Sequence, residues 1–107
     1  MTDPKIVLQD LAQRLRAAFP GKVKEVILHG SHLRGDARED SDYDFVIVWN
    51  GAVTEELRDA IYGVAFETDL ALDVLVHPLI IGTNEKDSNR WHLPLFADAF
   101  VHGLKAA

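Results

Sequence analysis

The chain of 107 residues carries 17 acidic and 11 basic residues and no cysteine, which gives a formal net charge of −6. This acidic balance disfavours direct binding to a nucleic-acid backbone, which needs clustered Lys and Arg, and the absence of cysteine excludes disulfides and thiolate metal sites. No apolar run approaches the roughly 18 residues of a membrane span, and the amino terminus is unlike a signal peptide, so we expect a cytoplasmic protein without membrane contacts.

The first half of the chain predicts one helix and two strands. We expect Thr2 to cap a helix whose first turn holds Asp3 and Pro4, and apolar residues then recur at helical spacing. A short run rich in β-branched residues predicts a strand over residues 23–28. A second run, over residues 42–49, is apolar on both faces after its first residues, which is typical of a central strand.

The second half predicts two helices and a third strand. Thr54 is expected to cap a helix with two glutamates in its first turn. Residues 70–76 predict the third strand, ended by Pro78, and Pro94 suits the first turn of a last helix. The order α-β-β-α-β-α indicates a single α/β domain over residues 1–107, in which helices flank a small mixed β-sheet.

The segment Gly-Ser-His-Leu-Arg-Gly-Asp-Ala-Arg-Glu-Asp-Ser-Asp-Tyr-Asp, residues 30–44, links the first two predicted strands. Gly30 lets a phosphate approach the main chain because no Cβ stands in the way. Ser31 begins a predicted helical turn, where free N–H groups and the helix dipole favour negative charge. Arg34 and Arg38 lie in the same loop and suit phosphate contacts and ordinary solvation equally well. The segment predicts a phosphate-binding turn.

Acidic side chains at the start of the second predicted strand indicate a metal site. Asp42 and Asp44 share one strand face, about 6.7 Å apart along the backbone, and can lean towards one cation or bridge two. Mg²⁺ binds such oxygen ligands together with substrate phosphates. We also expect a third carboxylate on the third strand, where Asp73 is preferred over Asp69 because apolar residues flank it. Asp73 would then also suit the role of general base.

The joint pattern Gly30-Ser31, ten intervening residues and Asp42-x-Asp44 resembles the signature of the DNA polymerase β-like nucleotidyltransferase superfamily. It is most similar to the minimal nucleotidyltransferases of bacteria and archaea, and the resemblance covers nearly the whole chain. It implies the nucleotidyltransferase fold, with ATP held through its triphosphate at the Gly-Ser turn. It also implies a site for two Mg²⁺ ions that the two strand acids bind and Asp73 completes.

The resemblance implies a biological role as well. Many members of this family are antitoxins encoded beside a small helical HEPN ribonuclease, and some transfer AMP from ATP to a tyrosine of that toxin. We therefore expect Mg²⁺-dependent transfer of AMP to a hydroxyl of a HEPN-type partner. The alternatives are a catalytically weak antitoxin that acts by binding, and a modifier of small molecules similar to aminoglycoside nucleotidyltransferases. One departure is His32, which stands where many relatives place Arg and weakens phosphate neutralisation there.

Overall fold

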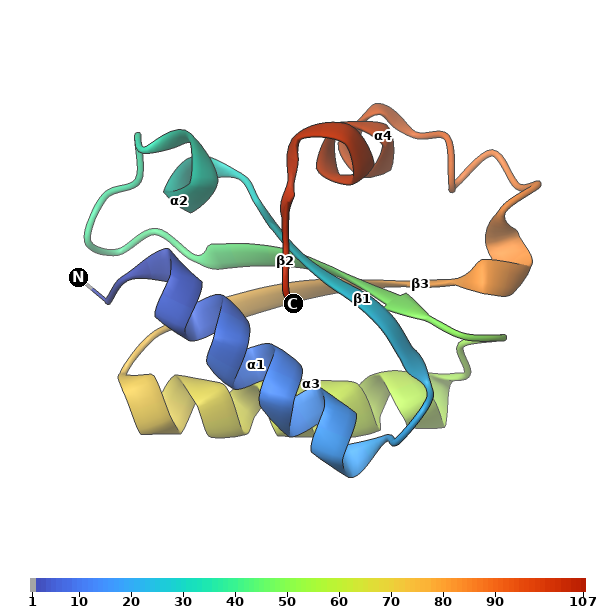
Figure 1. Ribbon diagram of the computed structural model, residues 1–107, viewed down its shortest axis with the longest axis horizontal. Coiled ribbons are helices and arrows are strands. Elements are labelled where there is room, and N and C mark those ends of the chain that lie inside the picture. The colour runs from blue at the N-terminus through green and yellow to red at the C-terminus, as the bar shows by residue number, and fades with distance from the viewer. Residues whose placement is uncertain (1) are drawn as a thin grey trace.

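The computed structural model describes residues 2–107 as a four-stranded mixed sheet with helices on both faces (Figure 1). In chain order the elements are α1 Pro4–Ala18, β1 Val23–His29, α2 Ser31–Arg34, β2 Tyr43–Trp49, α3 Glu55–Leu72, β3 Val76–Gly82, the 3₁₀ turn η1 Thr83–Glu85, α4 Pro94–His102 and β4 Leu104–Lys105. The strand order is β3-β2-β1-β4. β2 pairs antiparallel with β1 and parallel with β3, and β4 pairs antiparallel with β1. The predicted α/β class with a small mixed sheet is confirmed.

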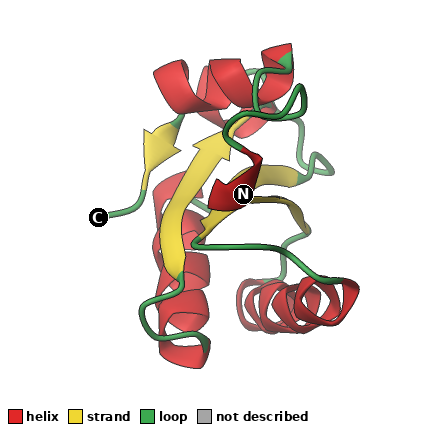
Figure 2. Ribbon diagram, turned by 90° about the vertical axis from the view of Figure 1, so that its right-hand side faces the viewer, coloured by secondary structure: helices red, strands yellow, loops and turns green. Residues whose placement is uncertain are grey.

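Helices α1 and α3 cover one face of the sheet, and α4 covers the other (Figures 1 and 2). Because successive strand residues point to opposite faces, β2 contributes to both cores. Phe45 and Ile47 pack in the cluster formed with α1 and α3. Val46 and Val48 pack in a second cluster with Phe96 of α4. All four β2 side chains are buried, so the prediction of a central strand is confirmed.

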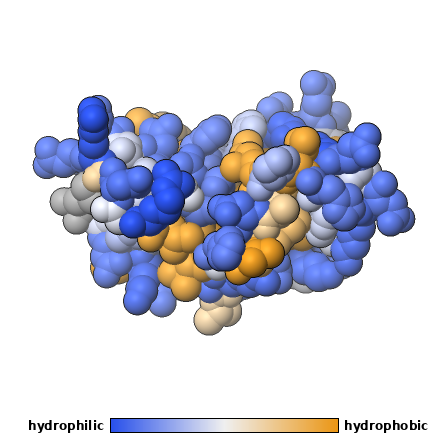
Figure 3. All heavy atoms as spheres, turned by 90° about the horizontal axis from the view of Figure 1, so that it is seen from above, coloured by the Kyte–Doolittle hydropathy of each residue, from blue (hydrophilic) through white to orange (hydrophobic). Residues whose placement is uncertain are grey.

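The outer surface on the α4 side is largely hydrophilic, with apolar side chains gathered over α4 (Figure 3). Leu93, Leu95 and Val101 are the large apolar residues exposed in that region. Within residues 2–107, none of the helices is both long enough and apolar enough to cross a membrane.

The amino-terminal cap of α1 differs from the prediction, which was wrong by one residue. Asp3, not Thr2, is the cap, and its carboxylate accepts the N–H of Lys5 at 2.9 Å. A carboxylate is the stronger cap because the helix dipole adds to its hydrogen bond. Pro4 then begins the helix, as expected. The carbonyl of Thr2 instead accepts the hydroxyl of Tyr43 at 2.7 Å, which ties the amino terminus to β2.

The predicted third strand over residues 70–76 is wrong. Helix α3 continues to Leu72, because its buried stripe keeps helical spacing, and Asp73 ends it in the left-handed conformation at φ 53°. Strand β3 begins only at Val76 and includes Pro78, which was expected to end the strand. Proline is tolerated because β3 is the outermost strand of the sheet.

A small polar cluster fixes the connection between β3 and α4. The carboxylate of Glu85 accepts the N–H of Gly82 at 2.8 Å and pairs with Arg90 at 2.8 Å. Arg90 also donates to the carbonyl of Ile80 at 2.8 Å and lies over the ring of Phe96. Glu85 therefore links the end of β3 to the helix that covers the sheet.

Glu85→Gln is expected to lower the free energy of unfolding by about 1–2 kcal/mol near neutral pH, because charge-assisted hydrogen bonds are lost. Burial raises the pKa of Glu85, but the bonds from Gly82 and Arg90 outweigh it, so the net pKa lies below 4.5. The stabilisation is present above that value and lost as the pH falls through the folded pKa. Urea unfolding across this range measures it, with exposed Glu56→Gln as control. A loss that stays constant down to low pH would contradict this origin.

Candidate active site

The Gly-Ser turn lies where the sequence predicts it, directly after β1. Gly30 has φ 80° and ψ −157°, a backbone conformation essentially restricted to glycine. Its carbonyl accepts the N–H groups of Leu33 and Arg34 at 3.2 and 3.1 Å, which starts the single turn of α2 at Ser31. Gly35, in the left-handed conformation, ends that turn. The N–H of Ser31 is thus at the first position of a helical turn that follows a strand.

The carboxylate of Asp44 lies directly against this turn. Asp44 pairs in register with His29, the residue before Gly30. A Cβ at position 30 would overlap Oδ2 of Asp44 and would lie 3.1 Å from its Cβ and Cγ. The glycine is therefore needed twice, for its backbone conformation and for the close approach of the carboxylate. The structure brings together the predicted phosphate turn and one predicted metal ligand.

Asp44 alternates with the buried Val46 and Val48 and so belongs to the sheet face that α4 covers, whereas Asp42 lies immediately before β2, outside the strand. Asp42 is exposed and Asp44 is half-buried. The intervening Tyr43 points to the opposite face, where it is buried among α1 and α3 residues. The common face predicted for the two acids stays a prediction, because Asp42 precedes the strand.

The residue beside Asp44 on β3 is a histidine, which the sequence reasoning did not identify. His77 pairs in register with Asp44, and its Nδ1 lies 3.3 Å from Oδ1 of Asp44. Its ring is largely exposed. The sequence prediction missed His77 because it placed the third strand over residues 70–76. Only the strand over residues 76–82 aligns His77 with Asp44.

His29 completes a row of three paired residues across β1, β2 and β3, with Asp44 in the middle and His77 on the other side. His29 is 6% exposed, and its Nε2 has no hydrogen-bond partner among the described residues. Burial lowers the pKa of His29, although the charge of Asp44 opposes this shift. His29 is therefore a buried residue beside Asp44, and its lowered pKa favours the neutral imidazole.

Asp73 does not occupy the strand face predicted for it. It is the exposed residue that ends α3, outside any strand. The carboxylate on α3 whose pKa is affected by the charge of Asp42 is that of Asp69. Partial burial raises the pKa of Asp69, the N–H of Val76 opposes this shift through a 2.8 Å hydrogen bond, and the charge of Asp42 raises the pKa further. Within residues 2–107, no three His, Asp or Glu side chains are clustered closely enough to hold a metal ion.

The two predicted arginines lie on the loop that follows the turn. Arg34 is exposed and contacts Asp36 at 3.5 Å. Arg38 is also exposed, and its N–H donates to Oγ of Ser41 at 2.8 Å. Both side chains are free to reorient towards an anion because their surroundings are solvent-exposed.

His32 has a packing role in this loop. Its ring stacks on Tyr43 with 3.6 Å between centroids and 9° between planes. Its Nε2 lies 3.0 Å from the carbonyl of Ser41, in a hydrogen bond. His32 is buried and holds the loop against the start of β2, so it is directed away from the solvent in front of Ser31.

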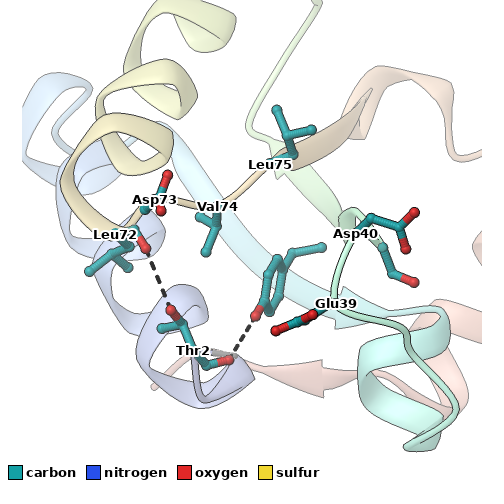
Figure 4. Close-up of a pocket in the computed structure, with 9 residues that line it drawn as sticks. Thr2, Glu39, Asp40, Leu72, Asp73, Val74 and Leu75 are labelled. Carbon is teal, nitrogen blue, oxygen red and sulfur yellow. Dashed lines mark hydrogen bonds between the residues drawn. The ribbon is translucent and has the colours of Figure 1, made fainter.

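A hollow of about 790 Å³ lies on the Tyr43 side of the sheet (Figure 4). It lies between the end of α3, the loop before β2 and the amino terminus. Its lining combines acidic side chains with apolar ones and includes Thr2, Glu39, Asp40, Ser41, Tyr43, Leu72, Asp73, Val74 and Leu75. The lining includes Ser41 and Tyr43, which are the chain neighbours of Asp42.

Known proteins are similar to this chain in sequence and fold. The nucleotidyltransferase domain family matches residues 8–97 of the chain. A provisionally named protein adenylyltransferase of Methanocaldococcus jannaschii is 29% identical over 82 residues, which cover 77% of this chain and 83% of that protein. A second one from the same organism is 39% identical over 41 residues, 38% of this chain and 41% of that protein. The crystal structure of a provisionally named nucleotidyltransferase from Sulfolobus solfataricus superposes with a TM-score of 0.51 and 26% identity, covering 78% of this chain and 75% of that one.

Proposed function

This chain belongs to the nucleotidyltransferase domain family, and on that premise we propose that it transfers AMP from Mg²⁺-bound ATP to a hydroxyl group of a partner protein. One structural observation carries the proposal: the Asp44 carboxylate lies against Gly30, so close that a side chain there would overlap it. A group bound at the Gly-Ser turn would therefore lie beside carboxylate oxygens. Phosphate chemistry assisted by a hard cation needs this juxtaposition.

The residues present fit Mg²⁺. Asp42 and Asp44 offer carboxylate oxygens, the ligand type that this ion prefers, two residues apart at the start of β2. Because no three suitable side chains are clustered within residues 2–107, the remaining ligands would come from ATP phosphates and water, which is the usual way for Mg²⁺ to bind in nucleotide sites. Mg²⁺, when bound, would neutralise phosphate charge and favour the pyrophosphate leaving group.

The chain's own residues would then orient the reactants. The N–H and hydroxyl of Ser31 and the open backbone at Gly30 would hold the β- and γ-phosphates, with Arg34 and Arg38 free to add positive charge. The acceptor oxygen attacks the α-phosphorus, the bond from that phosphorus to the oxygen bridging to the β-phosphate breaks, and pyrophosphate departs. The hydroxyl proton passes to water. The protein's contribution is positioning and charge neutralisation.

The acceptor that we propose is a helical HEPN-type toxin, which would make this chain its antitoxin. The names of both M. jannaschii relatives, as protein adenylyltransferases, support a protein acceptor. The resemblance of the 30–44 segment to the minimal nucleotidyltransferases supports the HEPN partner.

Incubation with ATP labelled at the α-phosphate, Mg²⁺ and a HEPN-type protein encoded beside this chain is expected to label that protein. Mass spectrometry should place the AMP on a hydroxyl side chain, and omission of Mg²⁺ should abolish the label. Label from the γ-phosphate would instead indicate a kinase, and no label from either position would contradict the proposal.

A specific observation favours the alternative of an antitoxin that acts by binding alone. Tyr62, Phe66 and Leu70 are large apolar residues exposed on α3, as in surfaces that associate with other proteins. If the chain with Asp42→Asn and Asp44→Asn still protects cells from the toxin, binding is sufficient. Loss of protection by a variant that still binds the toxin would instead assign protection to catalysis.

A further inference from the structure

The hollow beside Asp42 combines an apolar wall with an acidic rim (Figure 4). Leu72, Val74 and Leu75, from the end of α3 and the segment after it, form the apolar wall. Glu39 and Asp40 belong to the loop on the opposite side. The hollow thus suits a segment with both an apolar and a positively charged side chain.

Leu75 connects this hollow to the acids of the site. Its carbonyl accepts the N–H of Tyr43 at 2.8 Å, so it lies beside the chain segment that carries Asp42. Its side chain is nevertheless 62% exposed. An exposed leucine at the edge of a hollow and next to a proposed metal ligand indicates a surface that another molecule covers.

The apolar surface continues along α3. Tyr62, Phe66 and Leu70 recur every four residues, which places them along one side of the helix. They are 42%, 58% and 70% exposed, while Ile61 and Ala65 are buried against the sheet. The apolar row therefore faces away from the core and leads to the end of α3, where the hollow begins.

The charges at the carboxyl end of the row favour a basic partner over a second copy of this chain. Arg58 and Asp59 offset each other at the amino end of the apolar row, whereas Asp73 lies at its carboxyl end, and Glu39 and Asp40 face that end across the hollow. Two copies docked through this surface would bring acids against acids, with a formal charge of −6 on each chain. A partner with Lys or Arg around apolar residues would instead gain from both interactions.

We propose that the hollow and the apolar row of α3 form the docking site of the acceptor polypeptide. The inference rests on the proposed function and adds where the acceptor binds and what it must carry. An apolar side chain of the acceptor contacts Leu72, Val74 and Leu75, and neighbouring Lys or Arg side chains pair with Asp40 and Asp73. This orientation delivers the acceptor hydroxyl to the side of the site where Asp42 lies.

The probe for this site is a short fluorescent helical peptide built from Leu and Lys with a single Tyr. Fluorescence anisotropy at physiological salt measures its affinity for the whole chain. We expect it to bind, and we expect a peptide with Glu for Lys, or one with Ser for Leu, to bind about tenfold more weakly or worse. Equal binding of the three peptides, or no binding of the first, would overturn the proposal.

Charge variants locate the site. Asp40→Asn with Asp73→Asn is expected to weaken the Leu/Lys peptide about tenfold, and Asn tolerates the left-handed backbone at position 73. Glu56→Gln with Asp87→Asn removes the same net charge from exposed positions elsewhere and should leave the affinity within about twofold. Equal weakening by both pairs would show non-specific attraction and overturn the proposal.

Apolar variants complete the test. Leu75→Ser with Phe66→Ser should also weaken the peptide about tenfold, whereas Leu95→Ser on α4, also exposed, should not. If gel filtration shows that the first pair abolishes a dimer, the partner is a second copy and the proposal is wrong. Binding of Mg²⁺ and ATP, measured separately by calorimetry, tests the proposed function, because the docking variants leave Gly30 and Asp44 intact.

Discussion

Replacing Asp42 and Asp44 together by Asn is expected to slow AMP transfer on the order of 10³-fold or more while the chain stays folded. The Asp44 carboxylate lies against the Gly-Ser turn, and Asp42 is two residues away in the chain. Asn keeps their size but removes the charge that binds Mg²⁺. A quenched assay of label transfer from ATP measures the rate, and calorimetry should show that Mg²⁺ no longer assists ATP binding.

A matched variant separates the site from the overall charge. Asp36→Asn with Asp87→Asn removes the same two charges from exposed positions and should retain most of the activity. The two variants should have similar circular dichroism and unfolding midpoints. Full activity of the chain without Asp42 and Asp44 carboxylates would exclude them as metal ligands.

Gly30→Ala is the second substitution expected to have a large effect, and its main consequence should be a lower free energy of unfolding. The backbone at φ 80° and ψ −157° is strained for any residue with a Cβ, and that Cβ would overlap the Asp44 carboxylate. We expect the free energy of unfolding to fall by about 2–4 kcal/mol from these two causes together. The midpoint of urea unfolding measures it, and any folded fraction should bind ATP poorly because Asp44 is displaced.

Gly35→Ala is the control for backbone strain alone. Gly35 also has a positive φ, 85°, but a Cβ there would meet nothing within 4 Å. The loss should be about 1 kcal/mol, because the left-handed backbone of Gly35 is less strained than that of Gly30, so the difference between the two alanine variants measures the extra strain at Gly30 together with the contact with Asp44. Equal losses would mean that the contact carries no cost.

The part of the site that the sequence predicts correctly depends on local signals. A β-branched run, a Gly-Ser pair and a second apolar run define β1, α2 and β2, and Gly35 ends the turn between them. The alternation of a strand then places Asp44 and the buried Tyr43 on opposite faces without any knowledge of tertiary structure. These features follow from residues that are near one another in the chain.

The part of the prediction that is wrong depends on the pairing register of strands that are distant in the sequence. The sequence from Leu70 to Val76 is apolar except at Asp73, as in a buried strand, yet its first residues also continue the helical stripe of α3, and packing against the sheet selects the helix up to Leu72. The error moves Asp73 out of the site and conceals His77, whose position beside Asp44 is set by the parallel pairing of β3 with β2. No local pattern encodes that pairing.

The histidine after Ser31 illustrates a related limit. Composition indicates only that His32 carries less charge than arginine, whereas the structure shows its ring stacked on Tyr43 and bonded to the Ser41 carbonyl. Its contacts are with the loop before β2, so its effect on activity would come through the placement of Asp42.

Pro78 has a consequence for assembly. It lies in β3, the strand at one margin of the sheet, where a foreign strand would otherwise find a continuous row of amide donors. Proline supplies none, so this margin is a poor template for intermolecular β-pairing and for the aggregation that such pairing begins. Pro78 therefore protects the edge strand β3, which also carries His77, against pairing with strands of other molecules.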